Sequence, residues 1–389
     1  MPIINRIADF HPELTATRRD IHAHPELGFQ EQRTSEMVAQ QLQAWGIEVH
    51  RGIAGTGLVG VLRNGSSGRS IGFRADMDCL PMEETNDFTY RSTNAGKMHA
   101  CGHDGHTTML LGAARYLAET KNFDGTVHFI FQPAEEGGGG GRVMVEEGLF
   151  DRFPCDAVYG MHNTPELPLG EARIVAGPVL AAADRINITV HGKGGHASRP
   201  QSCIDPVLVG AHIVVAVQSI VSRSMDPLDS AVISICQFHA GSAGNVIPEV
   251  AELNGTVRTF KPEVQDMVEA RLHQIVRATA EAHGTRAELS FQRGYPPTVN
   301  HAAQTERAAL AAAAVLGEAK VLRHAPPRMG AEDFSYMLLA RPGCFIGIGQ
   351  GDGGRHSVSL HNPRYDFNDD LIPLGSSLFA RLAEQEMPR

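Results

Sequence analysis

Residues 125–141, GTVHFIFQPAEEGGGGG, join an apolar run to two adjacent carboxylates and five consecutive glycines. The run 125–132 is short, apolar and bounded by turn residues, which predicts a strand. Adjacent carboxylates such as Glu135 and Glu136 repel each other unless a cation or a proton lies between them. The stretch therefore predicts a strand that leads into a chemical site. Two solvated glutamates before a glycine linker are the alternative interpretation.

Short apolar strands and helices alternate on both sides of this stretch. Helical patterns lie at about 12–22, 31–45, 107–119 and 142–148, and strand-like runs lie at 57–62, 70–74 and 157–161. Alternation at this spacing is typical of a largely parallel sheet with helices on both faces. We therefore expect an α/β domain, to which the last helix, near 372–386, also belongs.

The pattern changes near Gly177. The elements that follow are a strand at 185–191, a helix at 206–222, strands at 231–240 and 250–259, a helix at 262–282 and a strand at 286–292. This order is that of a ferredoxin-like unit. We therefore expect an inserted domain over about 178–293, with 1–177 and 294–389 forming the other domain.

The composition is that of an ordinary globular protein. Its 389 residues are 42% apolar and 20% charged, and the chain is longer than one core usually organises. The formal charge of −10 leaves no excess of basic residues for a nucleic acid or an anionic membrane. We find neither a signal-peptide core nor an apolar run of about 18 residues, so we expect a cytoplasmic protein. Six cysteines without framework spacing predict reduced thiols.

A second polar cluster is MHACGHDGHT, residues 98–107, which holds Cys101, His103, Asp104 and His106. Thiolate and imidazole are strong ligands for zinc-like ions, and the glycine between Cys101 and His103 lets both side chains converge across a turn. Asp104 or His106 could then orient a ligand. Metal binding is favoured here over a purely structural role.

Two further clusters lie at predicted strand ends or in loops. Asp76 and Asp78 occur in RADMDCLP, His162 in GMHNTP and His361 in SLHNP. Taken alone, the two aspartates are equally typical of a solvated turn with a helix cap, and each histidine is more often an ordinary loop histidine than a ligand. Together with the first two clusters they complete a set of five ligand-type side chains, the number that two bridged ions need.

This succession of motifs resembles the M20D group of the M20 metallopeptidases, which includes hippurate hydrolases, N-acyl amino acid amidohydrolases and plant auxin-conjugate hydrolases. Ten ordered motifs between about residues 18 and 383 carry the resemblance: RRDIHAHPELGFQE, RADMDCLP, MHACGHDGHT, FQPAEEG, GMHN, GKGGHASRP, GNVIPE, GTVRTF, GAEDFSYM and LHNP. The resemblance implies a zinc-exopeptidase-like catalytic α/β/α domain with an inserted ferredoxin-like α+β domain that serves as a lid and in dimerisation.

Carried over position by position, the resemblance implies two divalent ions per subunit, which could be zinc, manganese, cobalt or nickel. The ligands that it implies, with Cys101 bridging, are Cys101, His103, Glu136, His162 and His361. Asp78 would orient a ligand. Asp76 stands where the wider clan has a ligating histidine, so this chain follows the Cys-Gly-His subfamily and we do not expect Asp76 to bind metal directly.

The resemblance also implies roles outside the metal ligands. Glu135 would be the general base, and His196 would stabilise the oxyanion, often across a dimer interface. Asn245 and Arg258 are candidates for holding the substrate carboxylate, because they offer amide and guanidinium donors. Glu332 would hold a nearby ligand or line the pocket.

The resulting hypothesis is a metal-dependent amidohydrolase that cleaves N-acyl amino acids, in which Glu135 takes a proton from an activated water and passes it to the leaving nitrogen. A dipeptidase or an N-acetyl-diaminopimelate-type deacetylase would use the same metal site. A non-catalytic metal-dependent binding protein would not need Glu135, and a structural dimer would not need the ligand set. We expect a homodimer or homotetramer with a small-molecule substrate and no nucleic acid or membrane partner.

Overall fold

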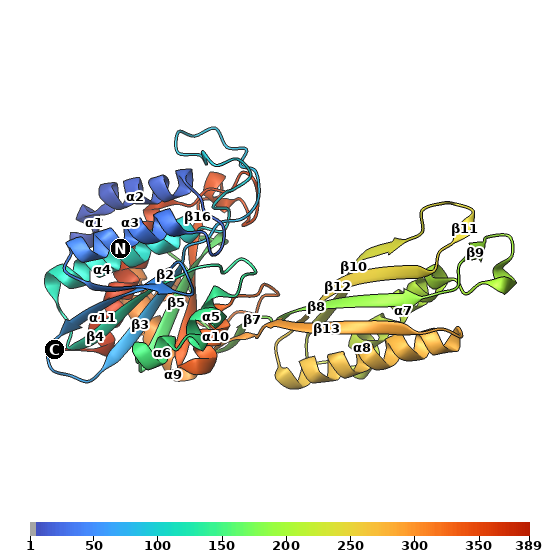
Figure 1. Cartoon of the computed structure of the whole chain (residues 1–389). Helices are drawn as coiled ribbons and strands as arrows, with labels where there is room; N and C mark the ends of the chain where they lie inside the picture. Colours follow the sequence, from blue (N-terminus) through green and yellow to red (C-terminus); the bar gives the residue numbers. More distant parts are fainter. Residues whose placement is uncertain (1–4) are drawn as a thin grey trace. The chain divides into compact units, whose positions relative to one another are not determined.

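The computed structural model describes residues 5–389, which form two compact units (Figure 1). Unit 1 comprises the chain up to Val179 together with Val299–Pro326 and Asp333–Arg389. Unit 2 comprises Leu180–Thr298 and Pro327–Glu332. The boundaries at Val179/Leu180 and Thr298/Val299 fall within strands β7 (Gly177–Leu180) and β14 (Thr298–Asn300), which pair with each other. The catalytic role of one unit and the lid or dimerisation role of the other stay predictions.

Unit 1 is built on an eight-stranded sheet with the order β1-β2-β4-β3-β5-β16-β6-β15. Its strands are β1 (Glu48–Ile53), β2 (Gly57–Asn64), β3 (Ser70–Asp76), β4 (Gly125–Gln132), β5 (Ala157–Pro168), β6 (Ala172–Arg173), β15 (Val321–Leu322) and β16 (Gly343–Gly351). The central strands β4, β3, β5 and β16 are parallel, as predicted.

The edges of this sheet differ from the largely parallel arrangement that the sequence predicted. Strand β2 pairs antiparallel with both β1 and β4, and β6 pairs antiparallel with β16. Only residues 54–56 separate β1 from β2. A parallel pair needs a crossover of a dozen or more residues. A connection of this length therefore permits only an antiparallel hairpin.

Helices cover both faces of the sheet. The helices of unit 1 are α1 (Asn5–Asp9), α2 (His11–Ala23), α3 (Gln32–Ala44), α4 (His103–Thr120), α5 (Gly140–Glu146), α6 (Leu149–Arg152), α9 (Ala302–Leu316), α10 (Phe334–Ala340) and α11 (Ile372–Glu386). Phe73 and Arg74 are neighbours on β3 and so point to opposite faces. The ring of Phe73 lies 5.0 Å from that of Phe379 on α11, whereas the Arg74 guanidinium lies 5.8 Å from the Phe334 ring on α10.

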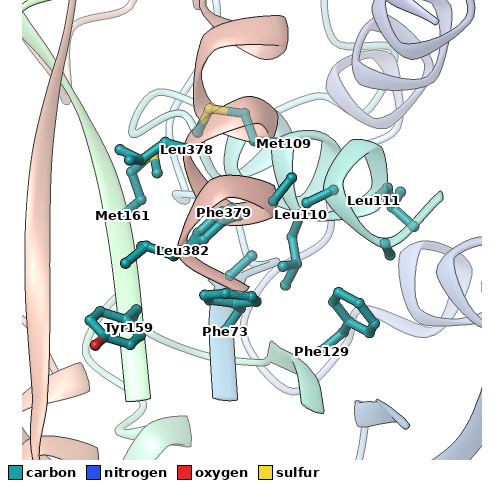
Figure 2. Packing of buried hydrophobic residues seen from close by; sticks show 14 of the residues in the cluster. Phe73, Met109, Leu110, Leu111, Phe129, Tyr159, Met161, Leu378, Phe379 and Leu382 are labelled. Carbon is teal, nitrogen blue, oxygen red and sulfur yellow. The ribbon is translucent and has the colours of Figure 1, made fainter. Parts of the chain in front are cut away.

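The main core of unit 1 lies between the sheet and helices α4 and α11 (Figure 2). The buried ring of Phe379 packs between Phe73 and the side chains of α4, and Tyr159 lies 6.2 Å from Phe73 between ring centroids. Glycines let the helices approach closely: a Cβ at Gly375 would lie 2.0 Å from the sulfur of Met109. This packing fixes α4, whose first residue is His103.

Unit 2 is a four-stranded antiparallel sheet with the order β10-β12-β8-β13, together with two long helices. Its elements are β8 (Ala183–His191), β9 (Gly195–His196), α7 (Pro206–Ser219), β10 (Ala231–Ala240), β11 (Val246–Ile247), β12 (Val250–Thr259), α8 (Pro262–Ala282) and β13 (Ala287–Tyr295). The order of the main elements and the strand order confirm the predicted ferredoxin-like arrangement. The short strands β9 and β11 form a separate ribbon.

Helix α7 corrects one expectation. With the π-helical turn that follows it, Pro206–Ser224 has a mean hydropathy of 1.5 and is long and apolar enough to cross a membrane, by length and composition alone. The sequence had suggested no such run. Val209, Ile213 and Val217 on one side of α7 are buried in the core of unit 2, whereas Val215 on the other side is 73% exposed.

We predict that Phe379→Ala lowers the free energy of unfolding of unit 1 by about 3–5 kcal/mol, because it leaves a cavity between the sheet and α4. Urea titration of chelator-treated protein, followed by circular dichroism, measures the change. The matched control is Leu339→Ala on α10, whose side chain is 73% exposed. It should change the free energy by less than about 0.5 kcal/mol. Equal effects of the two variants would contradict the packing described here.

Candidate metal centre

The carboxyl ends of the central parallel strands bring the predicted site residues of unit 1 together. Asp76 is the last residue of β3, Glu135 and Glu136 follow the end of β4, and His162 lies within β5. Parallel strands end at one edge of a sheet, which is where open α/β sheets carry their sites. The fold therefore explains why motifs distant in sequence converge.

Gly102 allows Cys101 and His103 to reach this edge from the start of α4. It has φ +93°, a left-handed conformation that favours glycine. A Cβ at this position would lie 2.4 Å from Oδ1 of Asn163 and 2.6 Å from the hydroxyl of Tyr365. The Cys-Gly-His spacing is thus a steric requirement as well as a chemical motif.

All five predicted metal ligands occur in groups whose ligand atoms lie within 4.8 Å of one another. The groups are Cys101 with His103 and His162, Cys101 with Glu136 and His361, and His103 with Glu135 and Glu136. Sγ of Cys101 lies 3.4 Å from Nε2 of His162, and Nε2 of His361 lies 3.2 Å from Oε1 of Glu136. Cys101 belongs to two of these groups, which fits a bridging position.

The chemistry of the donor set fits divalent cations. Burial, together with the nearby Glu136 and Glu135, raises the pKa of the Cys101 thiol well above its ordinary value. A cation in this position would favour the thiolate and offset the repulsion between the carboxylates. Nε2 of His103 is buried and has no hydrogen-bond partner among residues 5–389. A buried imidazole nitrogen without a partner is costly unless it binds a ligand.

The backbone at His361 is also constrained. Its φ is +61°, which a residue other than glycine rarely adopts, and its N–H donates to the carbonyl of Ala100 at 2.8 Å. This contact holds His361 directly beside Cys101. Strain of this kind is concentrated at functional sites.

Asp78 contacts two groups of the site. Its Oδ1 lies 3.2 Å from Nδ1 of His103, and its Oδ2 accepts a hydrogen bond from the backbone N–H of Glu136 at 2.9 Å. A carboxylate on Nδ1 leaves Nε2 of His103 as the ligand nitrogen. These are the contacts that an orienting role of Asp78 requires, and the role itself stays a prediction.

Asp76 contacts Arg74 and His106, and its Oδ2 also lies 3.7 Å from Nε2 of His103. It accepts from the buried Arg74 at 2.7 Å and lies 2.6 Å from Nδ1 of His106. The other nitrogen of His106 lies 2.8 Å from Oδ1 of Asn163, whose side-chain amide donates to Tyr365. Asp76, His103 and His106 also form a group whose ligand atoms lie within 4.8 Å of one another, so the expectation that Asp76 is not a direct ligand stays a prediction.

Asp104 holds helix α4 rather than a predicted ligand side chain. Its Oδ2 lies 2.8 Å from Nδ1 of His22 and 3.4 Å from Arg18, and all three side chains are buried. Burial alone would lower the pKa of His22, but hydrogen bonds with Asp104 and Glu84 outweigh burial and raise this pKa to about 9. Sequence reasoning passed over Arg18 and His22, although both lie in the motif RRDIHAHPELGFQE.

The predicted residues of unit 2 fall into two places. His196 on β9 faces Val246 on β11, and the carbonyl of Asn245 accepts from the N–H of Ala197 at 3.1 Å. Arg258 lies near the opposite end of β12, roughly 26 Å from Val250 at about 3.3 Å per residue. The structure therefore brings His196 and Asn245 together and keeps Arg258 apart from them.

Glu332 is buried and belongs to the segment Pro327–Glu332 of unit 2. Its carbonyl accepts a hydrogen bond from the hydroxyl of Thr298 at 3.4 Å. A role of its side chain at the site stays a prediction.

The fold and the clustered donor set define a class, a two-domain metallohydrolase. Within that class, the chain belongs to the peptidase family M20/M25/M40, whose model matches residues 72–385. It is 40% identical to the hippurate hydrolase of Campylobacter jejuni over 98% of this chain and 99% of that protein. It is also 38% identical to the N-acetylcysteine deacetylase of Bacillus subtilis, over 96% of this chain and 97% of that protein.

Solved structures share the whole architecture. A Bacillus subtilis protein described as a dinuclear metal binding peptidase of the M20 family has a TM-score of 0.84 at 34% identity, over 97% of this chain and 98% of that one. A putative aminohydrolase from methicillin-resistant Staphylococcus aureus has a TM-score of 0.90 at 30% identity, with the same coverage. These comparisons confirm the predicted family, the two-domain α/β fold and the hydrolase class.

We predict that Cys101→Ser lowers the number of divalent ions that the protein retains, because a hydroxyl is a much weaker ligand than a thiolate. Plasma mass spectrometry after dialysis against metal-free buffer measures the metal content. Cys155→Ser is the matched control, since Cys155 is a buried thiol of the same unit that donates to the carbonyl of Phe153. Loss of metal in both variants, or in neither, would contradict a ligand role specific to Cys101.

Proposed function

We propose that the chain is a metal-dependent amidohydrolase that cleaves the amide bond of N-acyl amino acids such as hippurate and N-acetyl amino acids. The observation that carries the proposal is the position of Glu135, whose carboxylate lies within 4.8 Å of ligand atoms of Glu136 and His103. A site for binding alone has no need of this second carboxylate. The relatives named for hippurate, N-acetylcysteine and IAA-amino acids all act on acylated amino acids, which supports the same substrate class.

Cys101, His103, Glu136, His162 and His361 are proposed to hold two divalent ions. Zinc, manganese, cobalt and nickel all suit a mixed set of thiolate, imidazole and carboxylate. When bound, such ions polarise the acyl carbonyl and lower the pKa of water. The relative described as a dinuclear metal binding peptidase supports a pair of ions here.

Glu135 is proposed to move the proton during hydrolysis. It takes a proton from the attacking water as the oxygen bonds to the acyl carbon. The same proton then goes to the amide nitrogen as the carbon–nitrogen bond breaks, so that the products are a carboxylic acid and a free amino acid. Asp78 keeps His103 and the backbone of Glu136 in place during these steps.

His196 is proposed to donate to the developing oxyanion, while Asn245 and Arg258 hold the substrate carboxylate. Arg258 is separated from His196 and Asn245 by most of the length of β12, which is longer than a small N-acyl amino acid. One copy of unit 2 therefore cannot bring both Arg258 and His196 into contact with the same substrate molecule. We propose a homodimer in which one copy supplies Arg258 and its partner supplies His196; a homotetramer would contain the same pair.

Exposed apolar groups of unit 2 support association between copies. Val215 is 73% exposed and Leu208 49% exposed on α7, and Phe238 is 37% exposed on the edge strand β10. Large apolar side chains exposed on a helix and on an unpaired edge strand are typical of surfaces that associate with another chain. The formal charge of −10 supports a small-molecule partner rather than a nucleic acid, and we propose a cytoplasmic location.

Glu135→Gln is expected to retain the bound metal and to lower kcat by about 10²–10⁴-fold, because the amide cannot accept the proton. Amine release from hippurate, N-acetyl amino acids and dipeptides, with manganese, cobalt or zinc supplied to chelator-treated protein, measures the activity and the substrate class. Glu136→Gln is the matched variant and should lose metal as well as activity. Full turnover in Glu135→Gln would exclude its role as base, and cleavage of dipeptides alone would indicate a dipeptidase.

Mixing two inactive variants tests the shared site. We expect His196→Ala and Arg258→Ala each to lose activity, and a mixture that is unfolded and refolded together to recover about a quarter of it. Half of the random dimers then contain both variants, and each of these has one intact site. A mixture as inactive as its components would show that both residues act within one chain, and light scattering gives the oligomeric state of each sample.

A further inference from the structure

The backbone just before the proposed base is held in an uncommon conformation. Ala134 has φ +52°, in the left-handed region that side chains other than glycine rarely adopt. Its carbonyl accepts from the N–H of Gly140 at 3.1 Å, which closes the loop that carries Glu135. Such a conformation persists only where the surrounding structure holds it.

Two carboxylates bind backbone N–H groups on either side of Glu135. Oε1 of Glu31 accepts from the N–H of Ala134 at 2.9 Å, and Oδ2 of Asp78 accepts from the N–H of Glu136 at 2.9 Å. Asp78 also contacts His103, so it belongs to the metal centre. Within residues 5–389, the carboxylate of Glu31 accepts hydrogen bonds from Thr56 and from the loop at Ala134, and from none of the proposed metal ligands.

Burial and a second hydrogen bond fix the position of the Glu31 side chain. It is 0% exposed and lies at the end of the segment that precedes α3. The hydroxyl of Thr56, in the turn between β1 and β2, donates to its Oε2 at 2.5 Å. Burial raises the pKa of Glu31, and the hydrogen bonds from Thr56 and Ala134 oppose this rise. A buried carboxylate is costly unless hydrogen bonds compensate for its lost hydration, and here Thr56 and Ala134 each supply one.

The segment before α3 also packs directly on the loop. A Cβ at Gly28 would lie 2.9 Å from Cβ of Ala134, and a Cβ at Gly138 would lie 2.7 Å from the same atom. Ala134 is therefore enclosed by glycines on two sides, and its N–H points to Glu31. Because of these contacts, we expect the backbone at Ala134 to change conformation only when the hydrogen bond between its N–H and Glu31 breaks.

We propose that Glu31 is a positioning residue for Glu135: by accepting the N–H of Ala134 it keeps the left-handed turn that aims the carboxylate of Glu135 at the substrate. The inference rests on the proposed function of Glu135 as general base. It assigns Glu31 no contact with substrate or metal. The motifs GFQE, residues 28–31, and FQPAEEG, residues 131–137, would thus act together to position Glu135.

The test compares two substitutions at Glu31. Glu31→Leu removes both acceptor oxygens, and we expect kcat to fall by about 10²-fold with KM changed less than about threefold, since misplacement of a catalytic group by about 1 Å has an effect of this size. Glu31→Gln keeps an oxygen for the N–H of Ala134, while Thr56 can accept from the new amide. It should recover most of the lost kcat, which separates the hydrogen bond from the charge.

Glu26→Leu is the control for damage to the same segment. Glu26 accepts from the N–H groups of Arg33 and Thr34 at 3.0 and 2.9 Å, at the start of α3, whereas the acceptor for the N–H of Ala134 is Glu31. We expect this variant to lose stability but to keep its kcat. A loss of kcat equal to that of Glu31→Leu would overturn the proposal in favour of a general structural effect.

Two further measurements separate this inference from the proposed function. In a Glu135→Gln background, Glu31→Leu should lower the residual kcat no further, because residues that act as a unit are not additive. Hydrogen exchange of peptides that cover 131–141 should be faster in Glu31→Leu than in Glu31→Gln, whether or not any substrate is cleaved. Unchanged exchange in Glu31→Leu would overturn the proposed role of Glu31. Faster exchange in a protein that shows no amidase activity would support the role of Glu31 in holding the loop and would contradict only the proposed amidohydrolase function.

Discussion

The burial of many ionisable side chains at one edge of a parallel sheet is the constraint on which the rest of the structure depends. A thiol, four imidazoles and several carboxylates meet where β3, β4 and β5 end. Without compensation, this concentration of charge would oppose folding. Buried basic groups provide part of the compensation, since Arg74 binds Asp76 and Asp333, and Arg18 binds Asp104. Bound cations would supply the remainder.

The arrangement around the site follows from this constraint. Asp76 faces Arg74 and Asp78 faces His103, whereas Glu136 belongs to the proposed ligand set and Glu135 is the proposed base. Backbone groups take part as well, through left-handed residues at Gly102, Ala134 and His361. These three positions set the direction of neighbouring side chains, so the precision of the site lies as much in the loops as in the sheet.

Much of this could be predicted from the sequence, because the fold places strongly patterned elements in a regular order. The parallel centre and the ferredoxin-like insert follow from the spacing of apolar runs, and adjacent chemical motifs identify the donor set. Contacts between motifs could not be predicted in this way. Asn163 meets Tyr365, 202 residues further on, and Glu31 meets Ala134, 103 residues further on, and neither pair has a local pattern that relates them. The hairpin of β1 and β2 was missed because Glu48–Ile53 was not predicted as a strand: its sequence, EVHRGI, has no regular alternation of apolar residues.

The pairing of β7 with β14 has a consequence for how such a protein arises. The chain leaves unit 1 and returns to it through two strands that lie against each other, so the inserted segment has its ends side by side. A segment with this property can be gained, lost or exchanged as a single genetic block without altering the order of the strands in the host sheet. The sheet that carries the metal centre and the inserted segment are therefore free to diverge at different rates.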